Sequence, residues 1–294
     1  MIKRTLFFTN KSSLTTKYEQ LVIKSETRET TIPIEDIGFV VIEHPEIYIS
    51  IPALNKLTGN NVSVIFCNEK HLPTGMLLNL EGHHLQQQLF QNQIQATEPL
   101  KKQLWQQTIK AKITNQAQVL ELQDHLKHPL KHYESKVLSG DTDNREAAAA
   151  AYYWKHVFPF EFKRERYGAF PNLFLNYGYT ILRAAMARAL SGVGLLNTLG
   201  IHHHNKYNAF CLADDIMEPY RPFVDRTVLE ILNEFDEEDL IVPIKTKLLN
   251  VLTETVYFED KKSPLMVGLT YTAQSLQSCF SGKTRKLNYP KLWN

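Results

Sequence analysis

Three carboxylates stand within five residues, at Asp214, Asp215 and Glu218. On a helix, Asp214 and Glu218 share one face, so their charges repel each other unless a cation lies between them. Pro219 follows directly and removes a backbone donor, which ends or kinks a helix and can aim the Glu218 carboxylate out of regular packing. The segment therefore predicts either a cation site or an ordinary acid–arginine network with Arg221 on a solvated helix face.

Three consecutive histidines, at 202 to 204, follow a Leu-Gly-Ile turn about a dozen residues before the acidic segment. Neutral imidazole binds transition metals and accepts protons near neutral pH. In an extended segment neighbouring side chains point in opposite directions, so the three rings cannot all face one site. We expect one of them to be functional and the others to pack or to meet solvent. A structural role is the alternative for any single one.

A polar cluster at residues 141–146 runs directly into five consecutive alanines. Alanine favours a helix, and either Asp143 or Asn144 could cap its start. Glu146 then lies in the first turn, where the helix dipole favours a carboxylate by roughly 0.3–1 kcal/mol, and this is the favoured interpretation of Glu146 taken alone. Two glutamates and a histidine together, however, make a hard, oxygen-rich site that suits magnesium or manganese better than structural zinc.

The composition indicates a folded chain with room for two domains. The 294 residues are 43% hydrophobic, and a formal net charge of +2 does not by itself indicate nucleic-acid binding, so any DNA surface must be local. The three cysteines are far apart, which argues against a disulfide framework or a close-paired zinc site. No segment resembles a signal peptide or reaches the ~18 apolar residues of a membrane span, so we expect a soluble, unexported protein.

The first part of the chain, residues 1–76, predicts a small β-rich domain. Short apolar or alternating segments are typical of strands, and a segment at 50–57 before a Gly-Asn-Asn turn predicts one short helix. The stretch 68–76, which contains Pro73 and Gly75, predicts the domain boundary. The expected strands are residues 5–8, 20–23, 31–34, 38–42 and 62–66.

The remainder, residues 77–294, predicts a larger all-α domain. Its segments are rich in good helix formers or place apolar residues at helical spacing. The fold class is therefore α+β, with a β-rich amino-terminal domain and an all-α carboxyl-terminal domain. Helices are expected within residues 84–137 and at 176–194, 226–236 and 243–257.

Three motifs in order strongly resemble the CRISPR-associated adaptation integrases, the first Cas family, and within it the type II branch. They are Tyr177-Gly178-Tyr179-Thr180, the sequence LGIHHHN at 199–205 and the sequence DIMEPYRPFVD at 215–225. The resemblance covers nearly the whole chain, and the ordered set is far more specific than any one motif. It implies a cytoplasmic prokaryotic enzyme that processes DNA.

The resemblance also implies the site residues. The metal ligands of the family are a glutamate that opens a helix, a histidine three residues beyond the Leu-Gly turn, and the glutamate of an Asp-x-x-Glu-Pro motif. These fall on Glu146, His203 and Glu218, which are thereby implied as catalytic ligands of Mg²⁺ or Mn²⁺, with Asp215 in a supporting role. Ala147 departs from the family pattern, since many members have glycine after the first glutamate, but a helical position should tolerate the change.

The implied activity is that of an integrase and endonuclease of CRISPR adaptation. The 3′-hydroxyl of a short foreign DNA, the protospacer, attacks a backbone phosphate at the boundary of the CRISPR repeat by transesterification, and water in its place gives nuclease activity. The implied partners are double-stranded DNA with 3′-OH ends, the repeat DNA, and a second copy of the chain bound through the β-rich domain. A small second Cas protein would bridge two such homodimers, and Cas nine is a further candidate.

The tail at 281–294 has no acidic side chain and predicts a region that contacts DNA phosphates, with a frayed solubilising tail as the alternative. Two rival functions stay open. One is a general metal-dependent nuclease for branched or repair DNA, and the other is a non-catalytic scaffold that binds nucleic acid. The basic residues of the tail are Lys283, Arg285, Lys286 and Lys291.

Overall fold

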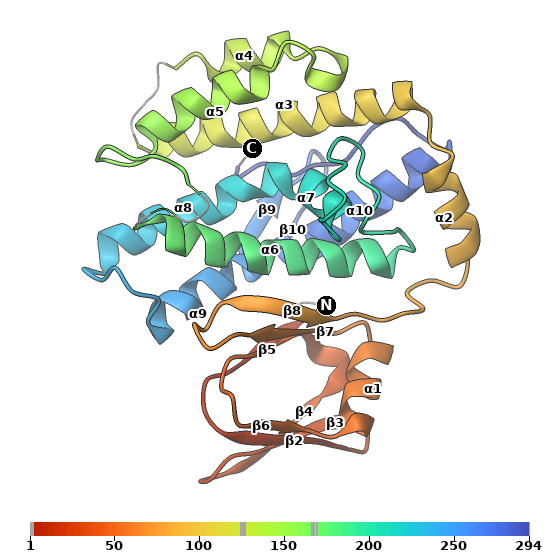
Figure 1. Ribbon diagram of the computed structural model, residues 1–294, viewed down its shortest axis with the longest axis vertical. Helices are drawn as coiled ribbons and strands as arrows, with labels where there is room; N and C mark the ends of the chain where they lie inside the picture. Colours follow the sequence, from red (N-terminus) through yellow and green to blue (C-terminus); the bar gives the residue numbers. More distant parts are fainter. Residues whose placement is uncertain (1–2, 124–127, 166–167, 169, 294) are drawn as a thin grey trace. The chain divides into compact units, whose positions relative to one another are not determined.

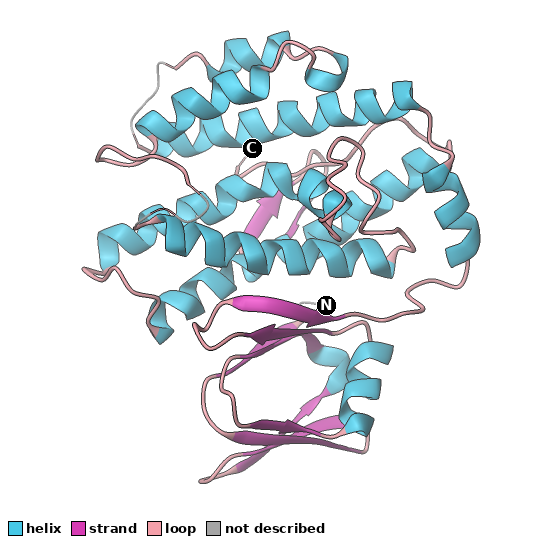
Figure 2. Ribbon diagram, viewed as in Figure 1, coloured by secondary structure: helices cyan, strands magenta, loops and turns pink. Residues whose placement is uncertain are grey.

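The computed structural model describes residues 3–123, 128–165, 168 and 170–293, and the chain divides into two compact units, Met1–His84 and Leu85–Asn294 (Figure 1). Figure 2 shows that most strands belong to the first unit, whereas the second is built mainly of helices. The predicted α+β class, with a β-rich amino-terminal part and a helical carboxyl-terminal part, is confirmed.

Two four-stranded sheets form the first unit. Their strands are β1 Arg4–Phe8, β2 Ser12–Lys17, β3 Gln20–Lys24, β4 Glu29–Pro33, β5 Ile37–Ile42, β6 Ile47–Ile49, β7 Ser63–Cys67 and β8 Pro73–Leu77. In one sheet β1, β5 and β7 run parallel, and β8 is antiparallel to β7. In the other, β2, β3 and β4 form an antiparallel meander, and β6 runs parallel to β2. All five expected strands are present, and the structure adds β2, β6 and β8.

The core of the first unit is made by inward-facing side chains of both sheets and of helix α1 (Ile51–Gly59). Side chains alternate along a strand, so each sheet contributes every second residue to this core. Ser50 caps α1 by accepting a hydrogen bond from the Ala53 amide at 3.3 Å, and Pro52 fits the first turn. The core includes Leu14, Leu21, Ile34, Val40, Leu57 and Val64, each at most 1% exposed.

The boundary between the units lies later in the chain than the sequence predicts. The first unit extends to His84, so the division placed after residue 76 was too early. Pro73 and Gly75 suggested a linker, but both belong to β8, which pairs with β7 at the edge of its sheet. An edge strand tolerates proline because its outer backbone groups need no partner strand.

A long central helix, α3, organises the second unit and contacts α4, α5, α8 and the 3₁₀ turn η3. Figure 1 shows α3 in yellow alongside α5 in green. Helix α6 is buried on most of its surface, as expected of a helix that is surrounded by others. No helix of the described residues is both long and apolar enough to cross a membrane. The helices of this unit are α2 Gln86–Ile94, α3 Glu98–Leu122, α4 Leu130–Lys136, α5 Arg145–His156, α6 Asn172–Gly192, α7 Cys211–Met217, α8 Arg221–Glu234, α9 Val242–Asn250 and α10 Leu265–Phe280, with η3 at Glu218–Tyr220.

The second unit is not entirely helical, which corrects the all-α prediction. The helix expected to reach residue 257 ends at Asn250, and the chain continues into β9 (Thr255–Tyr257), which pairs antiparallel with β10 (Lys262–Pro264). Thr255 and Val256 are β-branched and favour strand over helix. The short two-stranded ribbon therefore interrupts the helices before α10.

Candidate metal centre

The first turn of α5 is fixed by side chains that bind its free amides. Asp141 accepts hydrogen bonds from the amides of Arg145 at 2.9 Å and Glu146 at 3.0 Å. Asn144, in the left-handed conformation with φ of 53°, accepts from the Ala147 amide at 3.3 Å and is the cap residue. Glu146 is thus held in the first helical turn, where the helix dipole favours its charge.

A single buried carboxylate, that of Asp215, folds the histidine segment. It accepts hydrogen bonds from the amides of Ile201 at 2.7 Å, His202 at 2.9 Å and His203 at 3.2 Å. Gly200 is required at this turn, because a β-carbon there would lie 2.7 Å from an Asp215 carboxylate oxygen. The acidic segment and the histidine segment therefore form one folded structure.

The ring of His203 also contacts Asp215, with Nδ1 2.5 Å from Oδ1. This hydrogen bond raises the pKa of His203 above its usual value, and the charges of Glu218 and Glu146 raise it further. Burial acts against them and lowers it. Because Nδ1 faces a carboxylate, the ring presents Nε2 to any metal ion, an arrangement common among histidine ligands.

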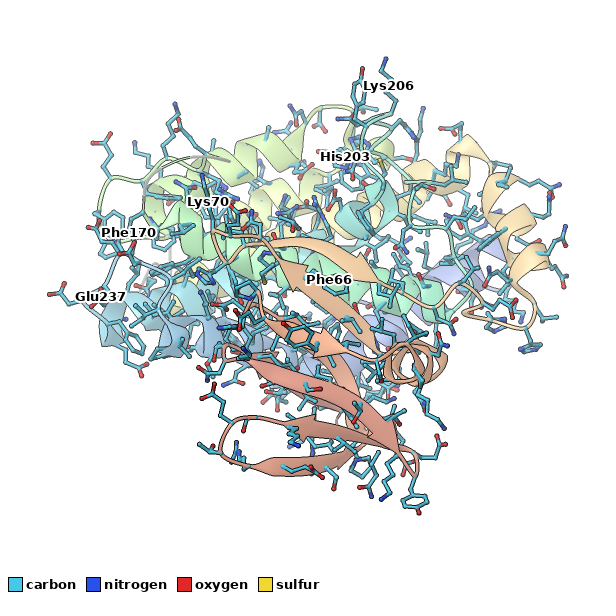
Figure 3. The ribbon with its side chains drawn as sticks, turned by 60° about the horizontal axis from the view of Figure 1, so that its bottom comes forward. Phe66, Lys70, Phe170, His203, Lys206 and Glu237 are labelled. Atoms are coloured by element: carbon cyan, nitrogen blue, oxygen red, sulfur yellow. The ribbon has the colours of Figure 1, made fainter. Side chains whose placement is uncertain are left out.

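The neighbouring histidines are placed differently. His202 stacks on Trp105 of α3 with ring centroids 4.1 Å apart, and its partial burial lowers its pKa. His204 is exposed. In Figure 3, His203 and the exposed Lys206 lie on the same loop, and Lys206 extends outward. The three histidines therefore divide between packing, the acidic cluster and solvent.

The three acids of the second motif each have their own partners. Pro219 ends α7, and Glu218 begins the 3₁₀ turn η3. Asp214 receives two hydrogen bonds from the guanidinium of Arg183, at 2.6 and 2.9 Å. Asp214, Asp215 and Glu218 are all buried, so the alternative of a solvated acidic face is wrong.

Glu146 and Glu218 meet around Lys112, in the middle of α3. The Lys112 ammonium lies 2.6 Å from Glu146 Oε1 as a hydrogen bond and 2.6 Å from Glu218 Oε2 as an ion pair. Arg221 Nε donates to the other oxygen of Glu218 at 2.8 Å. Burial by itself would raise the pKa of Glu218, but Arg221 and Lys112 lower it to about 2, so this buried group is a carboxylate.

The structure thus brings Glu146 and Glu218 onto one ammonium, and His203 is near enough for both charges to raise its pKa. The donor set of these three residues fits a hard divalent ion. Two carboxylates and one imidazole suit Mg²⁺ or Mn²⁺, and a cation already lies between the carboxylates in the form of Lys112. Among the described residues no three His, Cys, Asp or Glu side chains already stand in metal-holding geometry. Binding an ion would therefore require Glu146, His203 and Glu218 to close around it.

A buried acid behind the site was not identified from the sequence as functional. Asp225 accepts hydrogen bonds from the hydroxyls of Tyr153, at 2.8 Å, and Tyr179. Burial raises the pKa of Asp225 to about 6. Arg221 lies over the Tyr179 ring, 4.6 Å from its centroid, so this cluster supports the residue that holds Glu218.

The basic tail is folded, so the alternative of a frayed tail is wrong. The Gln107 side chain binds the carbonyl of Arg285 at 2.8 Å and the amide of Leu287 at 2.9 Å. Gln118 binds the last described residues in the same way. The four basic side chains of the tail are exposed, although the Lys286 ammonium lies 2.8 Å from Glu259. Whether they contact DNA stays a prediction.

Comparison with known proteins places these features in a family. The family model described as CRISPR associated protein Cas1 matches residues 6–240. The chain is 36% identical over 296 residues to the CRISPR-associated endonuclease Cas1 of Neisseria meningitidis serogroup C (strain 8013), covering 99% of this chain and 97% of that protein. The CRISPR-associated endonuclease Cas1 2 of Pyrobaculum aerophilum is 24% identical, with 87% of this chain and 92% of that protein covered.

Solved structures share the fold. A casposase bound to integration product superposes with a TM-score of 0.80 at 20% identity, covering 98% of this chain and 92% of the casposase. A Cas1 protein from Thermotoga maritima gives a TM-score of 0.77 at 17% identity, covering 96% and 98%. The matching family model and the 36% identical relative therefore define a CRISPR-associated protein. Within that class the chain belongs to the Cas1 family, as its motifs indicate.

Proposed function

We propose that the chain is the metal-dependent DNA integrase and endonuclease of CRISPR adaptation, with Glu146, His203 and Glu218 as catalytic ligands of Mg²⁺ or Mn²⁺. One observation carries the proposal: glutamates from α5 and η3 meet around a buried cation, beside a histidine whose pKa responds to both charges. Membership in the Cas1 family supports it.

The surrounding residues position the proposed ligands. Arg221 fixes the Glu218 carboxylate, and Asp215 fixes both the backbone and the ring of His203. A bound divalent ion would neutralise phosphate charge and lower the pKa of the attacking hydroxyl. The contribution of the protein is orientation in a partly dry site, which is a large part of catalysis in phosphoryl transfer.

The proposed substrates are a short double-stranded DNA with 3′-OH ends and the CRISPR repeat DNA. The 3′-hydroxyl attacks a repeat phosphate, and the displaced 3′-oxygen of the repeat strand leaves, so one phosphodiester bond replaces another. A solved relative is described as a casposase bound to integration product, and another as a Cas6-RT-Cas1–Cas2 complex. By analogy we propose a homodimer formed through the β-rich unit, a small Cas2-type protein that bridges two dimers, and Cas nine as a further partner.

A strand-transfer assay tests this function. Labelled DNA with a free 3′-hydroxyl is incubated with a repeat-containing plasmid, the small Cas partner and Mg²⁺ or Mn²⁺, and joined product is measured. Joining should require the 3′-hydroxyl and should disappear in Glu218→Ala, which should still bind DNA. Cutting without joining would instead indicate a general nuclease. DNA binding that is indifferent to Glu218→Ala, with neither cutting nor joining, would indicate a scaffold.

A further inference from the structure

Lys112 lies in the candidate metal centre although neither the motifs nor the family resemblance points to it. It projects from the middle of α3, and only 13% of its side chain is exposed. Its ammonium lies 2.6 Å from an oxygen of Glu146 and 2.6 Å from an oxygen of Glu218. The ammonium thus lies directly between the two carboxylates that are proposed to bind metal.

The charges around Lys112 already balance. Glu146 and Glu218 carry two negative charges, and Lys112 and Arg221 carry two positive ones. A divalent ion added between the carboxylates would meet an ammonium at the same place, at a distance where like charges repel strongly in a partly buried site. One of the two basic side chains must therefore move when such an ion binds.

Lys112 is the side chain better able to move. Arg221 is held on one side by Glu218 and on another by the Tyr179 ring, 4.6 Å from its guanidinium carbon. Lysine instead carries a compact charge on a flexible four-carbon stem with several alternative rotamers. The ion pairs that hold the Lys112 ammonium are those with the two glutamates that the metal would take.

Resting on the proposed function, we propose that Lys112 is an internal substitute for the metal ion. Its ammonium holds Glu146 and Glu218 together in the metal-free protein and is displaced when Mg²⁺ or Mn²⁺ binds. Lys112 therefore stabilises the metal-free fold and weakens metal binding. These two effects have opposite signs, which distinguishes this role from a purely structural one.

Mn²⁺ binding and thermal stability test the proposal on the full chain without DNA. Lys112→Met should lower the melting temperature in EDTA, because two carboxylates lose their shared cation. The same variant should bind Mn²⁺ about five- to tenfold more tightly by calorimetry, because no ammonium competes. Lys110→Met removes a lysine two residues earlier on the same helix, about 200° around it, and should leave Mn²⁺ affinity unchanged.

The alternatives give different results. If Lys112→Met binds Mn²⁺ no more tightly than the wild type, Lys112 does not compete with metal and the proposal is wrong, while the proposed function survives. If the wild type itself binds no Mn²⁺, the metal-dependent function fails, and this proposal fails with it. Glu218→Ala identifies the site, since it should abolish the Mn²⁺ binding that Lys112→Met strengthens.

A second measurement needs no variant and covers the case in which Lys112→Met fails to fold. Reductive methylation of the wild-type protein, followed by peptide mass spectrometry, reports how accessible each lysine amine is. Mn²⁺ should increase the methylation rate of Lys112 several-fold as the ammonium leaves its two ion pairs, whereas Lys110 serves as an internal reference and should not change. Equal Lys112 rates with and without Mn²⁺ would overturn the proposal.

Discussion

The carboxylate of Asp215 lies 2.5 Å from Nδ1 of His203. Its two oxygens also accept hydrogen bonds from the backbone amides of residues 201 to 203. One fully buried side chain thus determines both the path of the histidine loop and the orientation of one ring. Twelve residues separate the two positions in the chain. The acidic motif therefore organises the site as well as supplying it with charge.

Asp215→Asn should disturb the path of the histidine loop and the orientation of the His203 ring while leaving the fold of the second unit intact. The amide keeps the shape of the carboxylate but loses the charge. Asp215 raises the pKa of His203 in the wild type, so this pKa should fall in the variant. Loss of such a ligand-orienting hydrogen bond typically weakens metal affinity by about 10–100-fold. NMR titration of the metal-free protein measures the pKa, and calorimetry measures Mn²⁺ affinity. Asp214→Asn is the control, since Asp214 contacts Arg183 instead. An unaltered His203 titration in Asp215→Asn would contradict this account.

The three adjacent histidines should differ sharply in a strand-joining assay. His203→Ala removes the ring aligned by Asp215 and should reduce joining by roughly 100-fold or more. His204→Ala removes a ring that neither contacts Asp215 nor stacks on Trp105, and it should change joining little. His202→Ala should give an intermediate loss, because the stack on Trp105 helps to place the loop. Equal losses for His203 and His204 would show that the ring facing Asp215 has no special role.

Much of the first unit could be predicted from local pattern. Alternating apolar residues marked five strands, and Ser50 and Pro52 marked the start of α1. The missed strands lack such a signal: β2 is mostly Ser, Thr and Lys, β6 has three residues, and β8 contains proline and glycine. Their pairing depends on neighbouring strands rather than on their own composition.

The candidate site likewise contains residues that the sequence predicts and residues that it does not. The motifs nominate Glu146, His203 and Glu218, and clustered acids predict a cation among them. They do not predict that the cation present is Lys112, because α3 carries several lysines and the contact with Glu146 spans 34 residues of chain. Tertiary packing alone selects Lys112. The tyrosine pair around Asp225 was missed for the same reason, since it joins three helices.

The folded tail should contribute to DNA affinity through its charges. Lys283→Gln combined with Arg285→Gln should weaken binding and should reduce the slope of log affinity against log salt by about 0.9 for each phosphate that the variant no longer neutralises. Lys286→Gln should have a smaller effect, because Glu259 already neutralises that ammonium. Filter binding across a salt series provides the measurement. A slope that none of these changes alters would exclude the tail from the DNA surface.

The buried cluster of Asp225 should make stability depend on pH. Burial raises the pKa of the Asp225 carboxyl from 3.8 to about 6. Between these pH values the folded protein therefore binds more protons than the unfolded chain. The contribution of this group is therefore fully present below about pH 4 and is lost as pH rises through about 6, with a total of up to about 3 kcal/mol.

Asp225→Asn removes this titration and isolates the effect. The free energy of unfolding of the variant, relative to that of the wild type, should rise between about pH 4 and pH 7, even if the variant is less stable throughout because its amide fits the hydroxyls of Tyr153 and Tyr179 less well. Urea unfolding of both metal-free proteins at several pH values measures the difference. Asp236→Asn, which neutralises an exposed acid, should show little such trend. A difference between Asp225→Asn and wild type that stays constant across this range would mean that Asp225 titrates alike in the folded and unfolded states, and its burial between two tyrosines would then need another stabilising partner.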